Sequence, residues 1–406
     1  MKSAVNTEKE ILMLTSYPPR ECGIATYSKD LFNALAQTMG KSYVRICALE
    51  SSKLQRDYPE EVKYVLDTSK FHEYILFAEK VNKDKNIKAV FIQHEFGLFG
   101  GHYGEMLLYF LYSLKKPVMI TFHTVLPDPD KKLFSVVRSL IERADAVMVM
   151  TNHSANILVN EYSVLESVIH VIPHGTHPVQ FQDKSKLKEK YSLTGRITLS
   201  TFGLISANKS IETALEALPA VVEQFPEVMY LIIGRTHPEV VKHEGEAYRI
   251  SLEQRISRLG LSNNIRFINR YVELSELLEL LQLTDVYLFT SRDPNQAVSG
   301  TFAYAMSCGC PIISTAIPHA KEILTKDTGI LVGFNDIQGF SNALLTLLDD
   351  TVLHRRLGKN ILDTSRASEW PNVALSHKRM LQNYLPKQPL VLSLPVAENT
   401  SYRRAN

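Results

Sequence analysis

The amino-acid sequence predicts an α/β protein with two doubly wound parallel sheets, one in each of two domains. Short apolar runs of strand length alternate with helical patterns along the chain, which is typical of parallel sheets with right-handed crossovers. The alternation comes as two series, separated by a polar, lysine-rich segment at residues 178–190. A chain of 406 residues is long enough to bury a core of ordinary size in each domain.

The first series predicts strands and helices up to residue 172. Each strand is a short apolar run, and each helix has apolar residues on one face. The predicted strands are residues 11–15, 44–49, 89–93, 118–122, 146–150 and 168–172. The predicted helices include residues 26–39, 103–114, 131–143 and 155–160.

The second series predicts another parallel sheet, followed by a helix at residues 370–384 that holds the only tryptophan. Its strands are residues 197–202, 229–233, 265–268, 286–290, 311–314 and 329–332. Since ligands of such sheets lie beyond the carboxyl ends of the strands, two sheets of this kind favour a site between the domains. We predict four parts: domains at residues 1–180 and 181–368, a final helical segment at 369–386, and a disordered tail at 387–406.

Composition indicates a globular protein with no general affinity for nucleic acid, since 45% of residues are hydrophobic, 22% are charged and the formal net charge is +2. Only four cysteines occur, and Cys308-Gly-Cys310 lacks the spacing of a zinc pair. We expect no signal peptide and no membrane-spanning helix, and therefore a cytoplasmic protein. The lysines of residues 178–190 indicate a solvated helix face, with a phosphate or membrane contact as the alternative.

Residues 285–315 combine a buried strand, a polar loop, a helix start and a second strand. Ser299 is a good N-cap for the helix, and Gly309 ends it. Free N–H groups and the positive end of the helix dipole then lie above the strand ends, where they suit a phosphate or the hydroxyls of a sugar. We predict a sugar and phosphate site formed by Gln296, Ser299, Gly300 and Thr301.

Two loops of the first domain are further candidates for ligand binding. Gly23 lies in the loop after the first strand, where a glycine lets a ligand approach the backbone; a simple tight turn is the alternative. Residues 93–105 hold four glycines and form either an acceptor site or a flexible surface loop. His94 and Glu95 are of the types used in general acid–base catalysis, whereas the spacing of His94 and His102 fits no common metal site.

Seven segments within residues 10–385 follow one another in the order found in one enzyme family. They are LTSYPPRECGIATYSKDLFNALA, TFHTVLP, VIPHGT, STFGLISANKSIETALEAL, AMSCGCPIIST, IPHAKEIL and TGILV. Together they resemble the retaining glycosyltransferases of glycosyltransferase family 4 (glycosyl transferases group 1). The resemblance implies the GT-B fold, in which two Rossmann-like domains face each other across the active-site cleft. It also implies an acceptor-binding first domain, a second domain that binds the nucleotide sugar, and a last helix that crosses back to the first domain.

The chain departs from the family at several ligand-binding positions. The family has two glutamates where this sequence has Gln296 and Tyr304, and the second of them binds the ribose. Leu204 replaces an arginine that normally binds the diphosphate together with the lysine matched here by Lys209. His174 replaces an asparagine.

The residue patterns and the resemblance together suggest three sets of site residues. Catalytic roles are expected for His123, Lys209 and Gln296. Donor-binding roles are expected for Gly23, His174, Arg235, Arg292, Ser299, Gly300, Thr301 and Tyr304, with either arginine as the second cation. Acceptor-binding roles are expected for His94, Glu95 and His102.

The activity implied by the resemblance is retaining transfer of a hexose from a nucleoside diphosphate sugar to a hydroxyl of a saccharide or glycan. No metal and no cofactor are expected, because the helix N-terminus and Lys209 would hold the diphosphate. The expected partners are the nucleotide sugar and the acceptor, and a peripheral membrane contact stays open. One alternative is a disaccharide synthase or phosphorylase of the same fold. Another is a sugar-nucleotide-binding protein without catalysis, which the two missing glutamates suggest.

Overall fold

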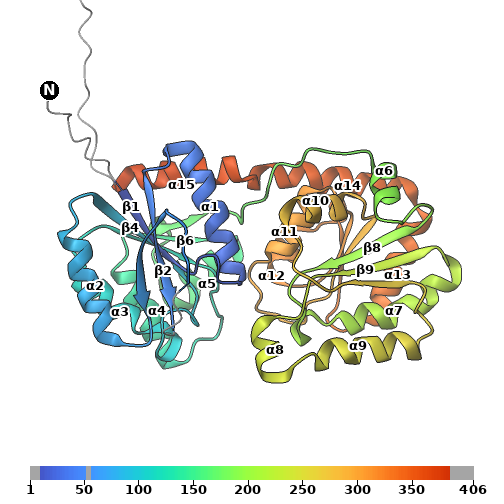
Figure 1. The fold of residues 1–406 in the computed structure, drawn as a ribbon, viewed down its shortest axis with the longest axis horizontal. Helices are drawn as coiled ribbons and strands as arrows, with labels where there is room; N and C mark the ends of the chain where they lie inside the picture. Colours follow the sequence, from blue (N-terminus) through green and yellow to red (C-terminus); the bar gives the residue numbers. More distant parts are fainter. Residues whose placement is uncertain (1–9, 52–55, 385–406) are drawn as a thin grey trace, which may run out of the picture.

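Two parallel sheets form the framework of the protein (Figure 1), and the computed structural model describes residues 10–51 and 56–384. The first sheet has seven strands, in the spatial order β3 (Val62–Asp67), β2 (Val44–Glu50), β1 (Glu10–Thr15), β4 (Ile87–His94), β5 (Val118–Phe122), β6 (Ala146–Val149) and β7 (Ile169–Val171). The second has six, in the order β10 (Ile265–Ile268), β9 (Val228–Ile233), β8 (Ile197–Phe202), β11 (Val286–Phe289), β12 (Ile312–Thr315) and β13 (Ile330–Val332). The predicted class, two doubly wound α/β domains, is confirmed. The tail predicted at residues 387–406 lies outside the described residues.

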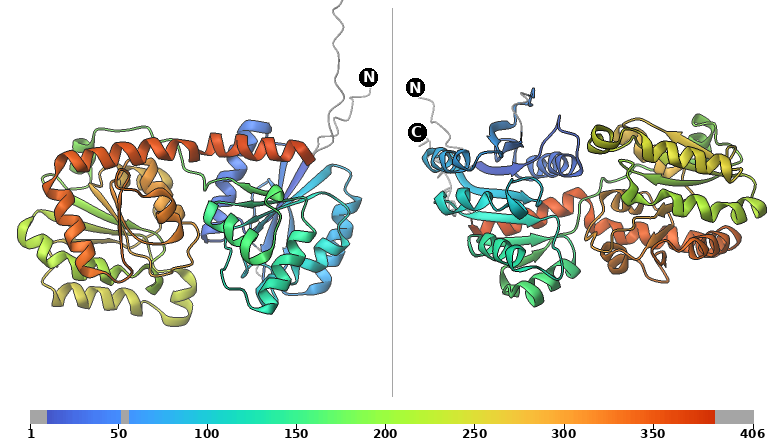
Figure 2. Two further views of the ribbon diagram at one scale, coloured as in Figure 1. Left: turned by 180° about the vertical axis from the view of Figure 1, so that it is seen from behind. Right: turned by 90° about the horizontal axis from the view of Figure 1, so that it is seen from below.

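Helices cover both faces of each sheet (Figure 2). Those of the first domain are α1 (Gly23–Met39), α2 (Phe71–Lys83), α3 (Leu107–Ser113), α4 (Lys131–Glu142) and α5 (Asn152–Tyr162). Those of the second are α6 (Lys184–Lys190), α7 (Ile211–Gln224), α8 (Pro238–Glu244), α9 (Ala247–Arg258), α10 (Leu274–Gln282), α11 (Gly300–Ser307), α12 (Pro318–Ile323), α13 (Ile337–Asp349) and α14 (Thr351–Ser365). None of the described helices combines the length and apolar character needed to cross a membrane.

The strands have apolar cores on both faces, because side chains alternate along each strand. In β1, Leu12 and Leu14 belong to one core, whereas Ile11 and Met13 belong to the other. In both sheets the strand order changes direction beside the first strand. The topological switch point lies between β1 and β4 in the first sheet and between β8 and β11 in the second. Loops at the carboxyl ends of these neighbouring strands diverge to opposite faces, which leaves room for a ligand there.

The last helix, α15 (Trp370–Tyr384), returns to the first domain and lies against α1 (Figure 1). Trp370 is only 4% exposed and, with Val373 and Leu381, joins the same core as the first strand. Gly175 makes this packing possible, since a Cβ at that residue would lie 2.3 Å from the indole ring of Trp370. The side chains of α15 therefore complete a core that begins more than three hundred residues earlier.

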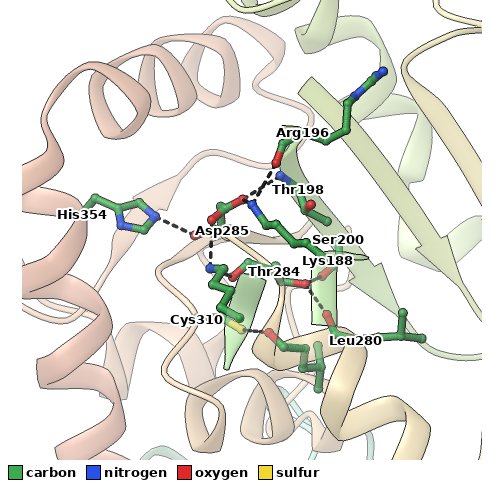
Figure 3. Close-up of polar contacts among 11 residues, drawn as sticks. Lys188, Arg196, Thr198, Ser200, Leu280, Thr284, Asp285, Cys310 and His354 are labelled. Carbon is green, nitrogen blue, oxygen red and sulfur yellow. Dashed lines mark hydrogen bonds and ion pairs between the residues drawn. The ribbon is translucent and has the colours of Figure 1, made fainter. Parts of the chain in front are cut away.

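A buried polar network ties the second domain together at the amino ends of β8 and β11 (Figure 3). The carboxylate of Asp285 accepts hydrogen bonds from Lys188 Nζ and Thr198 N–H, both at 2.7 Å, and pairs with Lys184 Nζ at 2.8 Å. His354 Nε2 lies 2.8 Å from the carbonyl oxygen of Asp285. The network joins α6 and β8 to the carboxylate of Asp285 and α14 to its backbone carbonyl, at the ends of the strands opposite the candidate site.

Two elements differ from the sequence prediction. Strand β3 was not predicted; it lies at the sheet edge, where only Leu66 is buried and no apolar run marks it. The helix predicted at residues 103–114 is divided, because Tyr103 has a positive φ of 58° inside the 3₁₀ turn His102–Gly104. The regular helix α3 begins four residues after Tyr103.

Candidate active site

The N-terminus of α11 faces the first domain (Figure 1) and is the centre of the candidate site. Ser299 caps the helix as predicted, because its hydroxyl accepts the Phe302 N–H at 3.4 Å. Gly300 meets the first domain directly: a Cβ there would lie 3.1 Å from His174 Nε2. Thr301 carries a hydroxyl 3.1 Å from that of Ser299. The helix start thus presents backbone N–H groups and hydroxyls toward the opposite domain.

Lys209 lies beside this helix start and has no carboxylate within ion-pair distance among the described residues. A Cβ at Gly203 would lie 3.2 Å from the Thr301 methyl group and 3.5 Å from Lys209 Nζ, so Lys209 and Thr301 flank the same glycine. Burial lowers the pKa of Lys209 to about 8. An ammonium that is partly desolvated and unpaired is suited to an anionic ligand.

Two neutral histidines of the first domain lie opposite α11. His123 Nε2 is 2.9 Å from Gln93 Oε1, and its ring contacts Tyr27 edge-on at 4.9 Å between centroids. His174 contacts the same tyrosine at 5.0 Å. Burial lowers the pKa of His123 to about 3, helped by the nearby His174, and burial also lowers the pKa of His174. Both side chains therefore act here as hydrogen-bonding groups and not as cations.

Gln296 and Tyr304, at the positions of the missing glutamates, are both engaged in the structure. Gln296 accepts a hydrogen bond from Ser291 Oγ at 2.7 Å and donates to the Val298 carbonyl at 3.3 Å, so its amide holds its own loop. Tyr304 is 8% exposed and donates to Asp30 Oδ2, on α1, at 3.1 Å. The ring of Tyr304 also stacks on His177, at 5.7 Å between centroids, and packs in a core of the second domain.

Other contacts also organise the boundary between the domains around the site. Within the first domain, His177 Nε2 lies 3.1 Å from Asp30 Oδ2, the oxygen that Tyr304 of the second domain also contacts. Glu322 on α12 accepts the Asn152 N–H at 3.0 Å, at the N-terminus of α5. These contacts involve partners more than a hundred residues apart, and sequence inspection did not identify Asp30, His177 or Glu322 as site residues.

The two candidate arginines lie in different surroundings. Arg235 forms an ion pair with Glu21, in the loop before α1, and so joins the domains instead of offering a free cation. Arg292 is exposed, and its backbone N–H donates to the Asn208 carbonyl at 3.1 Å, in the loop that carries Lys209. Gly23 is the first residue of α1, and a Cβ there would meet nothing within 4 Å. The backbone at Gly23 is therefore open to a ligand.

The three predicted acceptor residues are not alike. His94 is 0% exposed, because β4 continues one residue past its predicted end and directs this ring onto Phe99, at 5.6 Å between centroids. Burial lowers the pKa of His94 to about 3. This position is inconsistent with the predicted contact of His94 with an acceptor. Glu95 is partly buried and accepts from Thr124 Oγ1 at 2.7 Å, whereas His102 is exposed.

His319, at the start of α12, is a site residue that the sequence analysis missed. Its Nδ1 accepts the Ser299 N–H at 3.2 Å, so it contacts the helix start directly. It lies within IPHAKEIL, a segment interpreted only as the end of the second domain, and nothing in that segment indicates its distant partner. Among the described residues, no group of three or more His, Cys, Asp or Glu side chains could hold a metal ion.

Curated relatives share parts of this chain. A GDP-mannose-dependent monoacylated alpha-(1-6)-phosphatidylinositol monomannoside mannosyltransferase from Corynebacterium glutamicum is 23% identical over 187 residues, which are 45% of this chain and 46% of that protein. A mannosylfructose-phosphate synthase from Agrobacterium fabrum is 23% identical over 196 residues, which are 45% of this chain and 42% of that protein. The chain therefore matches about half the length of these relatives or less.

Solved structures and family models cover more of the chain. The crystal structure of HepE from Anabaena in complex with UDP has a TM-score of 0.75 at 16% identity, and the match covers 92% of this chain and 100% of that one. This similarity shows the GT-B fold. The family model described as Glycosyltransferase Family 4 matches residues 22–180, and the one described as Glycosyl transferases group 1 matches residues 183–363. The chain belongs to glycosyltransferase family 4, the glycosyl transferases group 1, and has the GT-B fold.

Proposed function

We propose that this chain transfers a hexose, with retention of anomeric configuration, from a nucleoside diphosphate sugar to a hydroxyl of a saccharide acceptor. The observation that carries the proposal is the position of Lys209, unpaired among the described residues, beside the capped N-terminus of α11. The dipole and free N–H groups of this helix would bind the diphosphate, and the ammonium would offset charge that develops on the leaving phosphate.

The surroundings of the donor sugar support a front-face displacement. A double displacement would need a carboxylate nucleophile close to the anomeric carbon. Gln296 carries a neutral amide at the position expected to contact the sugar, and its nitrogen and oxygen are both hydrogen-bonded within the loop. In a front-face mechanism the leaving phosphate itself helps to deprotonate the acceptor, and His123 would orient the sugar through a hydrogen bond.

The proposed acceptor is a saccharide, and two alternatives remain distinguishable from it. Similarity to a mannosylfructose-phosphate synthase favours a small soluble sugar phosphate as the acceptor. The replacement of both family glutamates, by Gln296 and Tyr304, favours binding without turnover. We place the reaction in the cytoplasm, because all four cysteines are free thiols in the described structure.

The proposal is tested by screening glucose and mannose donors that carry UDP, GDP or ADP. One of them should raise the melting temperature of the protein, since a ligand that binds only the native state stabilises it. With that donor and a panel of saccharides, proton NMR of the new linkage should show the anomeric configuration of the donor. An inverted product would overturn the retaining mechanism, and binding of a donor without transfer to any acceptor would favour the binding protein.

Turnover should survive removal of divalent metals. We expect the rate with the identified donor to be unchanged in excess EDTA, because Lys209 and the α11 N-terminus supply the positive charge that a metal would otherwise provide. The rate is measured before and after dialysis against EDTA, and again after addition of magnesium or manganese. A loss of activity that either metal restores would contradict the proposed metal-free mechanism.

A further inference from the structure

The imidazole of His319 is fixed against the start of α11 from two directions. The Ser299 N–H donates to Nδ1 at 3.2 Å, and the ring of Phe302, one turn further along α11, lies 4.9 Å away between centroids. The side chain of His319 is 7% exposed, and α12 begins directly before it with Pro318. The orientation of this ring is therefore determined by α11 itself.

The hydrogen bond to Nδ1 also determines where the imidazole carries its proton. A nitrogen that accepts a hydrogen bond has no hydrogen of its own, so the neutral ring of His319 must carry its hydrogen on Nε2. Burial lowers the pKa of His319 to about 3, with a smaller effect from the nearby His174, so the ring stays neutral near pH 7. Nε2–H makes no hydrogen bond to another described residue. The residue is 7% exposed and Nε2 is not among the fully buried atoms without a partner, so a ligand can reach it.

The other donors at this helix start show what His319 adds. The Phe302 N–H is taken by the Ser299 hydroxyl, and the Ser299 N–H is taken by His319. The N–H groups of Gly300 and Thr301 have no partner within the described part of the chain and remain for a ligand. The Ser299 N–H is no longer available to a ligand because it donates to Nδ1 of His319. The Nε2–H group, on the other side of the same ring, is available in its place.

We propose that His319 is a further donor-binding residue, whose Nε2–H donates to an oxygen of the nucleotide sugar held at the α11 N-terminus. The oxygen belongs either to the diphosphate or to a hydroxyl of the sugar, since both are good acceptors. This inference rests on the proposed function, which places the nucleotide sugar at this helix. It assigns a binding role to a residue of α12, which follows β12, whereas Lys209 follows β8 on the other side of β11.

The variant His319→Asn distinguishes the roles of the two ring nitrogens. The asparagine Oδ1 can still accept the Ser299 N–H, whereas the donor at the Nε2 position is lost. We expect the melting temperature to stay close to that of the wild type, and the affinity for the nucleotide sugar to fall about threefold to tenfold, as for loss of one hydrogen bond. His319→Gln is the reciprocal variant, because its amide nitrogen reaches the Nε2 position, and it should bind more tightly than His319→Ala.

The control is His377→Asn, which removes another buried histidine, in α15, whose Nδ1 lies 2.9 Å from the Val373 carbonyl.

Calorimetry with the identified donor, and with its nucleoside diphosphate alone, distinguishes the two acceptors. Weaker binding of both ligands in His319→Asn indicates a diphosphate oxygen, and weaker binding of the nucleotide sugar alone indicates a sugar hydroxyl. Equal affinity of wild type and His319→Asn, or equal affinity of the Gln and Ala variants, overturns the inference alone. A wild type that binds no nucleotide sugar overturns the proposed function as well.

Discussion

Lys209→Ala should lower kcat/KM at least about tenfold while leaving the fold intact. A charge-assisted hydrogen bond contributes about 1.5–3 kcal/mol, and about 1.4 kcal/mol corresponds to a factor of ten in rate. The ammonium is unpaired among the described residues, so its removal leaves no buried carboxylate without a partner. The control is Lys242→Ala, on α8 of the same domain, where the lysine side chain is 68% exposed. Steady-state kinetics of a folded Lys209→Ala variant that match the wild type would show that this lysine does not contact the donor.

The same lysine should give the reaction an alkaline limit. Because the pKa of Lys209 is lowered to about 8, the ammonium is present below that pH and is lost above it. The value of kcat/KM, which reports the free enzyme, should therefore fall as the pH rises through about 8. In Lys209→Arg the cation persists to far higher pH, so this decline should disappear whatever the absolute rate. A decline of the same shape in both proteins would assign it to another group.

Asp285→Ala should cause a large loss of stability in the second domain. The carboxylate is 19% exposed and contacts Lys184, Lys188 and the Thr198 N–H, of which Figure 3 shows Lys188 and Thr198. Removing one partner of a buried ion pair leaves the remaining charges uncompensated and costs about 3–5 kcal/mol. We expect a clear drop in melting temperature by calorimetry. The control is Asp363→Ala, whose side chain is 52% exposed beside Arg366 and should cost less than about 1 kcal/mol.

The contribution of Asp285 should also depend on pH in a definite direction. Burial alone would raise the pKa of Asp285, but the ion pairs with Lys184 and Lys188 outweigh it and hold the pKa below its usual value. A carboxyl whose folded-state pKa is depressed stabilises the fold above its unfolded pKa of about 3.9, and this stabilisation is lost as the pH falls further. The difference in melting temperature between wild type and Asp285→Asn should therefore be full at pH 7 and shrink below about pH 4. A difference that stays constant down to pH 3 would show that the charge of Asp285 is not what stabilises the domain.

The framework of the fold could be predicted because it rests on local patterns. Buried parallel strands are continuous apolar runs, and the Ser299 cap and Gly309 stop mark α11 directly in the sequence. Strand β3 was not predicted, because Val65 is exposed and Lys63 forms ion pairs with Glu10 and Asp84. Its sequence therefore has charged residues where a buried strand would have an apolar run. An edge strand of this kind carries little of the signal on which such predictions depend.

Site residues could be predicted only where their roles follow from the local sequence around them. The neighbourhood of Ser299, Gly300 and Thr301 follows from a helix start above a sheet, and the structure places Lys209 beside it. For His94 the prediction of an acceptor contact was wrong because β4 is one residue longer than predicted. His94 therefore belongs to the strand and points into the core instead of lying in the loop. His319 could not be found, because its role depends on a hydrogen bond to a residue in another βα unit.

The return of α15 to the first domain has a consequence for synthesis on the ribosome. The first domain emerges early, but the core around β1 and α1 lacks Trp370, Val373 and Leu381 until the second domain has been translated. Domains generally fold as units in the order of synthesis, yet here the first must keep an apolar surface uncovered while the second is made. A chain released before residue 370 would expose that surface permanently, so we expect premature termination to yield chaperone-bound or aggregated protein instead of a stable N-terminal fragment.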